Sequence, residues 1–296
     1  MGKISAIGWT DSTFNPWWGC EKVSPGCDHC YAEAWAARAG YPEVWSGKYR
    51  LFGDKHWNEP RKWNRKAEKA GKPLKVFCGS MCDILDNKVP GGSALRARLW
   101  QLAEDTPWLH WQFLTKRIGN ADRMLPQRWI KEGLPRHIWF GISVVNQEEA
   151  DRDIPKLLRI PTAVPWVSYE PALGPVDLGM IGRSLITPHI AWIVVGGESG
   201  PRARPFDLKW ARDTIRQGEA AQVPIFVKQL GSNPFDGGLQ SCEGPLGNCV
   251  AHDYAKFRLS DSKGTDPSEW PQDTRVREFP DEVIYPPFLE PKTIVL

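Results

Sequence analysis

The sequence predicts an α/β fold in the form of a partial or open (β/α) barrel. Short apolar runs rich in β-branched and aromatic residues alternate with helical stretches about every 25–35 residues, which is the pattern of repeated βαβ units. The chain has 296 residues, 41% of them hydrophobic, which is enough for one large barrel. Polar residues follow the apolar runs, at the strand ends where such barrels carry their sites. Seven predicted strands favour a barrel over a doubly wound sheet, although periodicity alone does not separate the two.

The predicted strands are short, and most are bounded by Gly, Pro or polar residues. They are residues 4–9, 74–79, 111–114, 138–145, 164–167, 190–195 and 223–227. The main helices are predicted at residues 29–39, 93–103, 147–158 and 208–221. Ser93 and Asp207 have the side chains that N-caps use, so we expect the second and fourth of these helices to begin there.

The domain organisation follows from where this alternation stops. Residues 1–231 are predicted to form the barrel. Residues 232–296 are rich in Gly, Pro and Asp, and we expect an extension packed on the barrel with short strands at 256–259 and 275–279.

Composition limits the class of protein. No apolar run is long enough to span a bilayer and the first residues do not form a signal peptide, so no membrane partner is expected. Seven cysteines without a secretory signal indicate a reducing compartment, and we expect a cytoplasmic protein.

One loop contains three closely spaced cysteines. Cys20, Cys27 and Cys30 follow the spacing Cys-x6-Cys-x2-Cys, directly after the first predicted strand. Thiolates crowded in this way bind a metal or an iron–sulfur cluster. Three protein ligands leave one coordination position open, whereas a closed zinc site takes four. Zinc completed by His29 or by a distant residue, and free thiols, are the alternatives.

Polar residues at the other strand ends are candidates for the same site, because the carboxyl ends of barrel strands meet at one mouth. The candidates, in chain order, are Ser80, Met81, Asp83, Lys116, Ser143, Asn146, Glu170, Gly196, Gly197, Glu198 and Lys228. A structural ion pair is the alternative role for the charged ones.

Six motifs of this sequence resemble a radical-SAM-like family that is common in phages and prophages. Its members carry a three-cysteine motif and are often encoded beside a "three-Cys-motif partner" protein, which makes such a protein an expected partner. The motifs are Asn15-Pro16-Trp17-Trp18-Gly19-Cys20, Ser24-Pro25-Gly26-Cys27-Asp28-His29-Cys30-Tyr31-Ala32-Glu33, Gly79-Ser80-Met81-Cys82-Asp83, Leu114-Thr115-Lys116-Arg117, Ser168-Tyr169-Glu170-Pro171 and Gly196-Gly197-Glu198-Ser199-Gly200-Pro201. The first cysteine gap, x6, departs from the x3 gap usual in radical-SAM enzymes.

The resemblance implies a fold, two cofactors and a set of roles. The fold is the radical-SAM type of partial barrel, and the cofactors are a [4Fe-4S] cluster on Cys20, Cys27 and Cys30 and S-adenosylmethionine. His29 takes the position before the last cysteine, where relatives place an adenine contact. The other cofactor-binding candidates are Ser80, Met81, Asp83, Ser143, Asn146, Gly196, Gly197 and Glu198, and the catalytic candidates are Lys116, Glu170 and Lys228.

Residues 48–75 carry a net charge of +7, so the rest of the chain is at −4. Trp57 and Trp63 are interleaved with the basic residues, and this combination suits contact with nucleic acid, although a solvated helix has the same composition. In the tail, Cys242, Cys249 and His252 repeat the x6 and x2 gaps and form a candidate second metal site.

The sequence therefore predicts a radical-SAM-type enzyme that cleaves S-adenosylmethionine, with a nucleic-acid base or nucleotide as the favoured substrate. A non-catalytic nucleic-acid-binding protein stabilised by a metal or a cluster is the alternative. A third interpretation keeps the cluster for electron transfer or sensing.

Overall fold

Seven parallel strands form one sheet in the computed structural model of the chain, which describes residues 5–178, 190–237, 255–256 and 258–280. In spatial order the strands are β1 (Ser12–Phe14), β4 (Leu74–Cys78), β5 (Leu109–Thr115), β6 (Ile138–Val144), β7 (Pro165–Tyr169), β8 (Trp192–Gly196) and β10 (Ile225–Gln229). This order equals the chain order, so the sheet lacks the reversal of a doubly wound fold. Within the described residues β1 and β10 remain edges. The predicted partial (β/α) barrel is confirmed.

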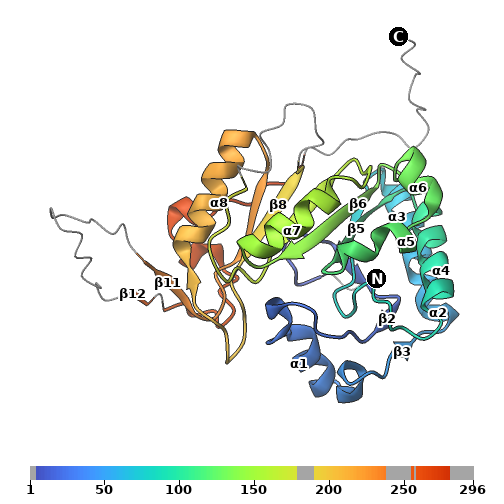
Figure 1. Ribbon diagram of the computed structural model, residues 1–296, viewed down its shortest axis with the longest axis horizontal. Coiled ribbons are helices and arrows are strands. Elements are labelled where there is room, and N and C mark those ends of the chain that lie inside the picture. Colours follow the sequence, from blue (N-terminus) through green and yellow to red (C-terminus); the bar gives the residue numbers. More distant parts are fainter. Residues whose placement is uncertain (1–4, 179–189, 238–254, 257, 281–296) are drawn as a thin grey trace, which may run out of the picture.

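Helices cover the outer face of this sheet (Figure 1). They are α2 (Asp54–Trp57), α3 (Glu59–Ala70), α4 (Gly92–Glu104), α5 (Ala121–Met124), α6 (Gln127–Glu132), α7 (Gln147–Leu157) and α8 (Leu208–Ala221). Asp207 caps α8 as predicted, because its carboxylate accepts the Lys209 N–H. The Ser93 cap is wrong: α4 begins one residue earlier, after Gly91, whose φ of 65° turns the chain without a capping side chain.

The first strand lies later in the chain than predicted. Residues 5–9 form turns, and β1 pairs Ser12 with Val76 and Phe14 with Cys78. Trp9 accounts for the error, because its ring is 4.7 Å from that of Phe77 inside the barrel. The apolar character of this segment reflects a side chain buried under the strands, not a strand.

The concave face of the sheet has two layers. At the amino ends of the strands it is aromatic, with Trp139, Trp166 and Trp192 packed around Trp9. Gly141 makes room for this packing, since a Cβ there would lie 2.4 Å from the Trp166 ring. Toward the carboxyl ends the inward positions become polar. Large rings thus close one end of the barrel and leave functional groups at the other.

An N-terminal segment lies across this polar end, which we call the mouth (Figure 1). It contains β2 (Trp17–Trp18), which pairs antiparallel with β3 (Arg50–Leu51), the 3-10 turns Pro25–Cys27 and Pro42–Trp45, and α1 (Tyr31–Arg38). Helix α1 occupies most of the predicted helix 29–39. Its buried face, Ala32 and Ala36, packs with Val44 and Met81.

The C-terminal part adds a small sheet of β12 (Ala255–Lys256), β11 (Pro234–Asp236) and β9 (Phe206–Asp207). Strand β12 overlaps the strand predicted at 256–259. The segment predicted as a strand at 275–279 forms one antiparallel bridge, from Arg277 to Phe226 at the edge of β10, instead of a full strand. The domain boundary at residue 231 stays a prediction. Within the described ranges, no helix has the length and apolar character needed to cross a membrane.

Candidate active site at the barrel mouth

A chain of polar contacts links groups from four strands, β5, β6, β7 and β10, at the mouth. Lys116, directly after β5, donates through Nζ to Ser143 Oγ of β6 at 2.6 Å. The Ser143 hydroxyl donates in turn to the Glu170 carbonyl oxygen, after β7, at 2.9 Å. The Glu170 carboxylate lies 3.0 Å from Lys228 Nζ of β10. The structure therefore brings together all three predicted catalytic residues and Ser143, with two amines and one carboxylate facing the mouth.

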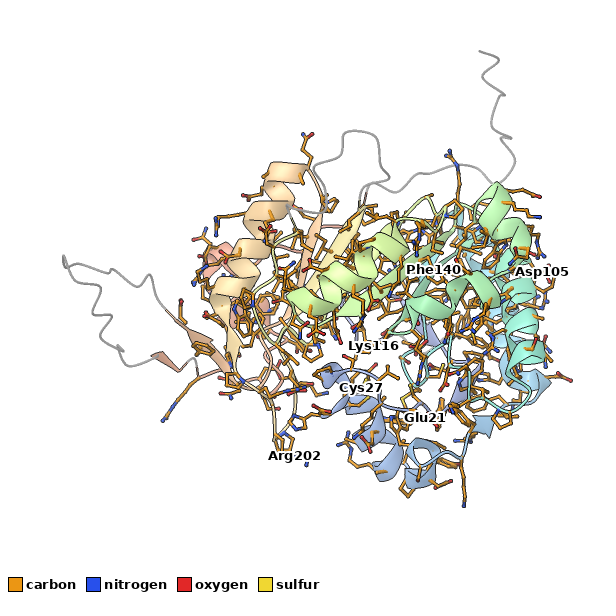
Figure 2. All side chains as sticks on the ribbon, viewed as in Figure 1. Glu21, Cys27, Asp105, Lys116, Phe140 and Arg202 are labelled. Carbon is orange, nitrogen blue, oxygen red and sulfur yellow. The ribbon has the colours of Figure 1, made fainter. Side chains whose placement is uncertain are left out.

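The cysteine loop is seated directly on these strand ends. A Cβ on Gly26 would lie 2.6 Å from Val145 Cγ1 and 3.4 Å from Lys116 Cε, so only glycine allows this approach. Figure 2 shows Cys27 beneath Lys116, where the N-terminal segment faces the strand ends. The central turn of the loop is thus held within reach of the polar layer.

Arg117 fastens the first part of the loop. Its Nη2 donates to the Glu21 carbonyl at 2.8 Å and lies 3.8 Å from Cys20 Sγ. The same guanidinium is 3.6 Å from an Asp86 oxygen and 3.9 Å from Asp83, two carboxylates that are almost fully buried. A buried cation with two carboxylates behind it therefore points its donors at the first cysteine.

Arg204 fastens the second part. Its guanidinium forms two hydrogen bonds with the Glu198 carboxylate, of 3.0 and 2.7 Å, and donates to the Pro25 carbonyl at 2.9 Å. His29 Nδ1 lies 3.0 Å from the same carboxylate, whose side chain is 5% exposed. Burial works against ionisation, but the hydrogen bonds from Arg204 and His29 hold the pKa of Glu198 below its usual value. Glu198 and His29, both predicted to bind cofactor, are thus engaged with each other and with the loop.

The segment after β4 is ordered by Asn15. Its amide donates to Ser80 Oγ at 2.9 Å and its carbonyl oxygen accepts the Met81 N–H at 2.7 Å. The Met81 carbonyl accepts from Gly19, and the Ser80 carbonyl accepts the Tyr31 hydroxyl at 2.9 Å. Ser80 Oγ accepts this hydrogen bond and donates to no group among the described residues, so its proton is available to a ligand.

Four other predicted residues have structural contacts in place. Asp83 accepts from the Thr115 hydroxyl and the Lys116 N–H, and its burial raises its pKa. Asn146 caps α7 by accepting the Glu149 N–H. Gly196 and Gly197 are in close contact with their neighbours: a Cβ would lie 2.7 Å from a Glu170 oxygen at the first and 2.3 Å from the Leu230 carbonyl oxygen at the second. Packing alone therefore requires these two glycines.

The three cysteines of the loop are free and half-buried. Burial, together with the nearby Asp83 carboxylate, raises the pKa of the Cys20 thiol to about 12, and burial also raises that of Cys30. In the part of the chain that the structure describes, no three His, Cys, Asp or Glu side chains come close enough to hold one metal ion. Cys242, Cys249 and His252 lie outside the described residues.

Sequence reasoning missed Asn15 and Arg204 as organisers of the site. Asn15 is the first residue of the motif that ends at Cys20, so its place beside the loop could have indicated a role at the site. Arg204 lies only six residues after its partner Glu198, but its role as an anchor of the loop has no local signal, because Pro25 and Asp28 are more than 170 positions away.

Comparison with known families matches residues 4–274 to the family described as "Protein of unknown function (DUF5131)". The chain belongs to this family. The match spans the barrel, the cysteine loop and both arginine anchors, so the contacts described above all lie within the DUF5131 region.

Comparison with curated proteins finds no match. Among solved structures, the chain is similar to a cysteine-to-serine variant of spore photoproduct lyase, with 11% identity and a TM-score of 0.48. It is also similar to spore photoproduct lyase complexed with dinucleoside spore photoproduct, with 12% identity and a TM-score of 0.47. Each match covers 80% of this chain and 68% of the other.

Proposed function

We propose that this chain is a radical-SAM-type enzyme that holds a [4Fe-4S] cluster through Cys20, Cys27 and Cys30. The observation that carries the proposal is the seating of three free thiols, on a loop anchored at both ends, over the polar mouth of a partial barrel. Three thiolates suit a four-iron cluster with one open iron, because each binds a different iron and they need a wider spacing than ligands of a single ion.

Such a cluster, when bound, supplies the electron for reductive cleavage of S-adenosylmethionine. The chain's own groups would bind and orient that cofactor. Ser80 would donate its free hydroxyl proton to the cofactor. Lys116 and Lys228 would place positive charge beside the carboxylate of a cofactor bound at the mouth. The aromatic layer below would exclude water from the lower barrel.

Glu170 would then determine how much of the positive charge of the two lysines is available to bind a ligand. Its carboxylate pairs with Lys228, whereas Lys116 is held by the neutral Ser143 hydroxyl. Lys116 is therefore the amine with its full charge available, and we expect it to contribute more than Lys228 to binding an anionic group.

Anaerobic purification followed by iron analysis tests the proposal. We expect about four irons per chain, and release of 5′-deoxyadenosine when the reduced protein meets S-adenosylmethionine. Stoichiometric zinc without iron would refute the cluster. A full cluster that neither binds nor cleaves S-adenosylmethionine would refute the enzyme and leave electron transfer, sensing or a cluster-stabilised binding protein.

A further inference from the structure

Four large apolar side chains are exposed among the described residues, and all four lie in the segment that crosses the mouth. They are Val23, Tyr31, Trp35 and Leu51, each between 43% and 50% exposed. Among the described residues, the helices that cover the outer face of the barrel contribute no large exposed apolar side chain. An exposed apolar set confined to one segment beside a candidate site marks a contact surface.

Helix α1 presents two of these residues together. Tyr31 and Trp35 are four positions apart and so share one face of the helix, while Ala32 and Ala36 form the neighbouring, buried face, about 100° further round the helix. Trp35 meets the Trp18 ring edge-on, with the ring centres 5.1 Å apart. This contact fixes an exposed indole in place at the rim of the mouth.

The cations beside these rings lack acidic partners. Arg50 lies 4.6 Å from the Trp18 ring centre and 4.0 Å from that of Tyr41, and none of the described carboxylates forms an ion pair with it. Lys48 and Lys55 are exposed and likewise form no ion pair among the described residues. Three acids of this region already pair with other cations: Glu33 with Lys22, Asp54 with Arg98 and Glu59 with Lys62.

We propose that this surface, made of Tyr31, Trp35, Lys48, Arg50 and Lys55, binds single-stranded nucleic acid at the rim of the mouth. An exposed, fixed indole offers a stacking face that is accessible to unpaired bases, and cations without partners suit a phosphate backbone. A protein partner without acidic residues at the contact would use the same apolar area but would leave the positive charge uncompensated.

This assignment is narrower than the whole basic stretch 48–75. Two cations of α3 are already paired, Arg61 with Asp105 and Lys62 with Glu59. Helix α3 packs against β4 and β5, and its remaining cations, Arg65, Lys66 and Lys69, are exposed on this helix and not on the segment that crosses the mouth. Binding of a strand at the rim is independent of the proposed function. Delivery of a base from that strand into the mouth rests on the proposed function.

The test is fluorescence anisotropy with labelled single-stranded DNA and RNA oligonucleotides, on anaerobically purified protein of measured iron content. We expect binding that weakens with salt, and Trp35→Ala about 5- to 150-fold weaker, the range for one lost stacking contact. Trp35→Phe keeps an aromatic face and should bind within about threefold of the unaltered protein. Trp35→Leu keeps apolar area but loses stacking, so it should resemble Trp35→Ala.

Charge is tested with a matched pair of variants. Lys48→Ala should reduce the slope of log affinity against log salt by about 0.7, as for one phosphate contact on a single strand. Lys131→Ala is the control, because Lys131 is also exposed and lies on α6, far from α1 (Figure 1). The proposal is overturned by absent binding at low salt, by undiminished binding in Trp35→Leu, or by equal effects of the two lysine changes. Binding without S-adenosylmethionine cleavage would refute only the proposed function.

Discussion

Removing the Arg204 side chain should destabilise the protein by about 2–3 kcal/mol. The change leaves the Glu198 carboxylate buried without its guanidinium, and breaking a buried pair from one side costs about 3–5 kcal/mol. The lower value applies here, since Glu198 keeps hydrogen bonds from the Arg204 backbone N–H and from His29. Arg204 itself is 27% exposed, which reduces the loss further.

A double-mutant cycle isolates the pair. Arg204→Ala, Glu198→Ala and the double variant would be compared by anaerobic urea titration followed by circular dichroism, and we expect a coupling of about 1–2 kcal/mol. Arg202→Ala is the control, because this neighbouring arginine is exposed and should change stability by less than about 0.5 kcal/mol. A coupling near zero, or an equal effect in the control, would refute the anchoring role of Arg204.

Four further results are expected. Gly26→Ala should lower the iron retained per chain while the fold persists, because its Cβ would meet Val145. Gly119→Ala is the control, because it adds a Cβ in open space and should leave the iron content unchanged. Equal iron content in the two variants would contradict the seating of the loop. Ser80→Ala should weaken S-adenosylmethionine binding about fivefold by titration, as for one lost hydrogen bond. The loss of stability in Glu198→Gln should be full above about pH 4.3 and shrink as the pH falls through the depressed folded-state pKa, as urea titrations across this range would show. Iron should be lost when Cys20, Cys27 or Cys30 is replaced singly by Ala. It should be kept in Cys78→Ala, because the Cys78 thiol is buried in the core.

The sequence predicted the sheet well because its strands are buried on both faces. Fully buried strands read as continuous apolar runs, and β6 and β8 match their predicted segments closely. Strand β1 was misplaced because it is three residues long and partly polar, whereas the apolar residues before it are buried without strand pairing.

The site was predictable where chemistry follows a strand end. Lys116, Glu170 and Lys228 were found in this way and lie together. The glycines after β8 were open to two interpretations, and only the structure reveals the contact between Gly197 and the Leu230 carbonyl that requires a glycine. The anchoring role of Arg204 was out of reach, because its contact with Pro25 joins distant segments and leaves no local pattern.

The two arginine anchors attach the cysteine loop to the ends of two strands, β5 and β8, that have β6 and β7 between them. Arg117 follows β5 and holds Cys20, whereas Arg204 follows β8 and holds the turn that carries Cys27. Six residues separate these thiols, and their distance in space therefore depends on how tightly the strands between β5 and β8 curl. A ligand that tightens or relaxes this curl would change the distance between the two thiols. The geometry of the loop would therefore depend on whether the barrel is occupied.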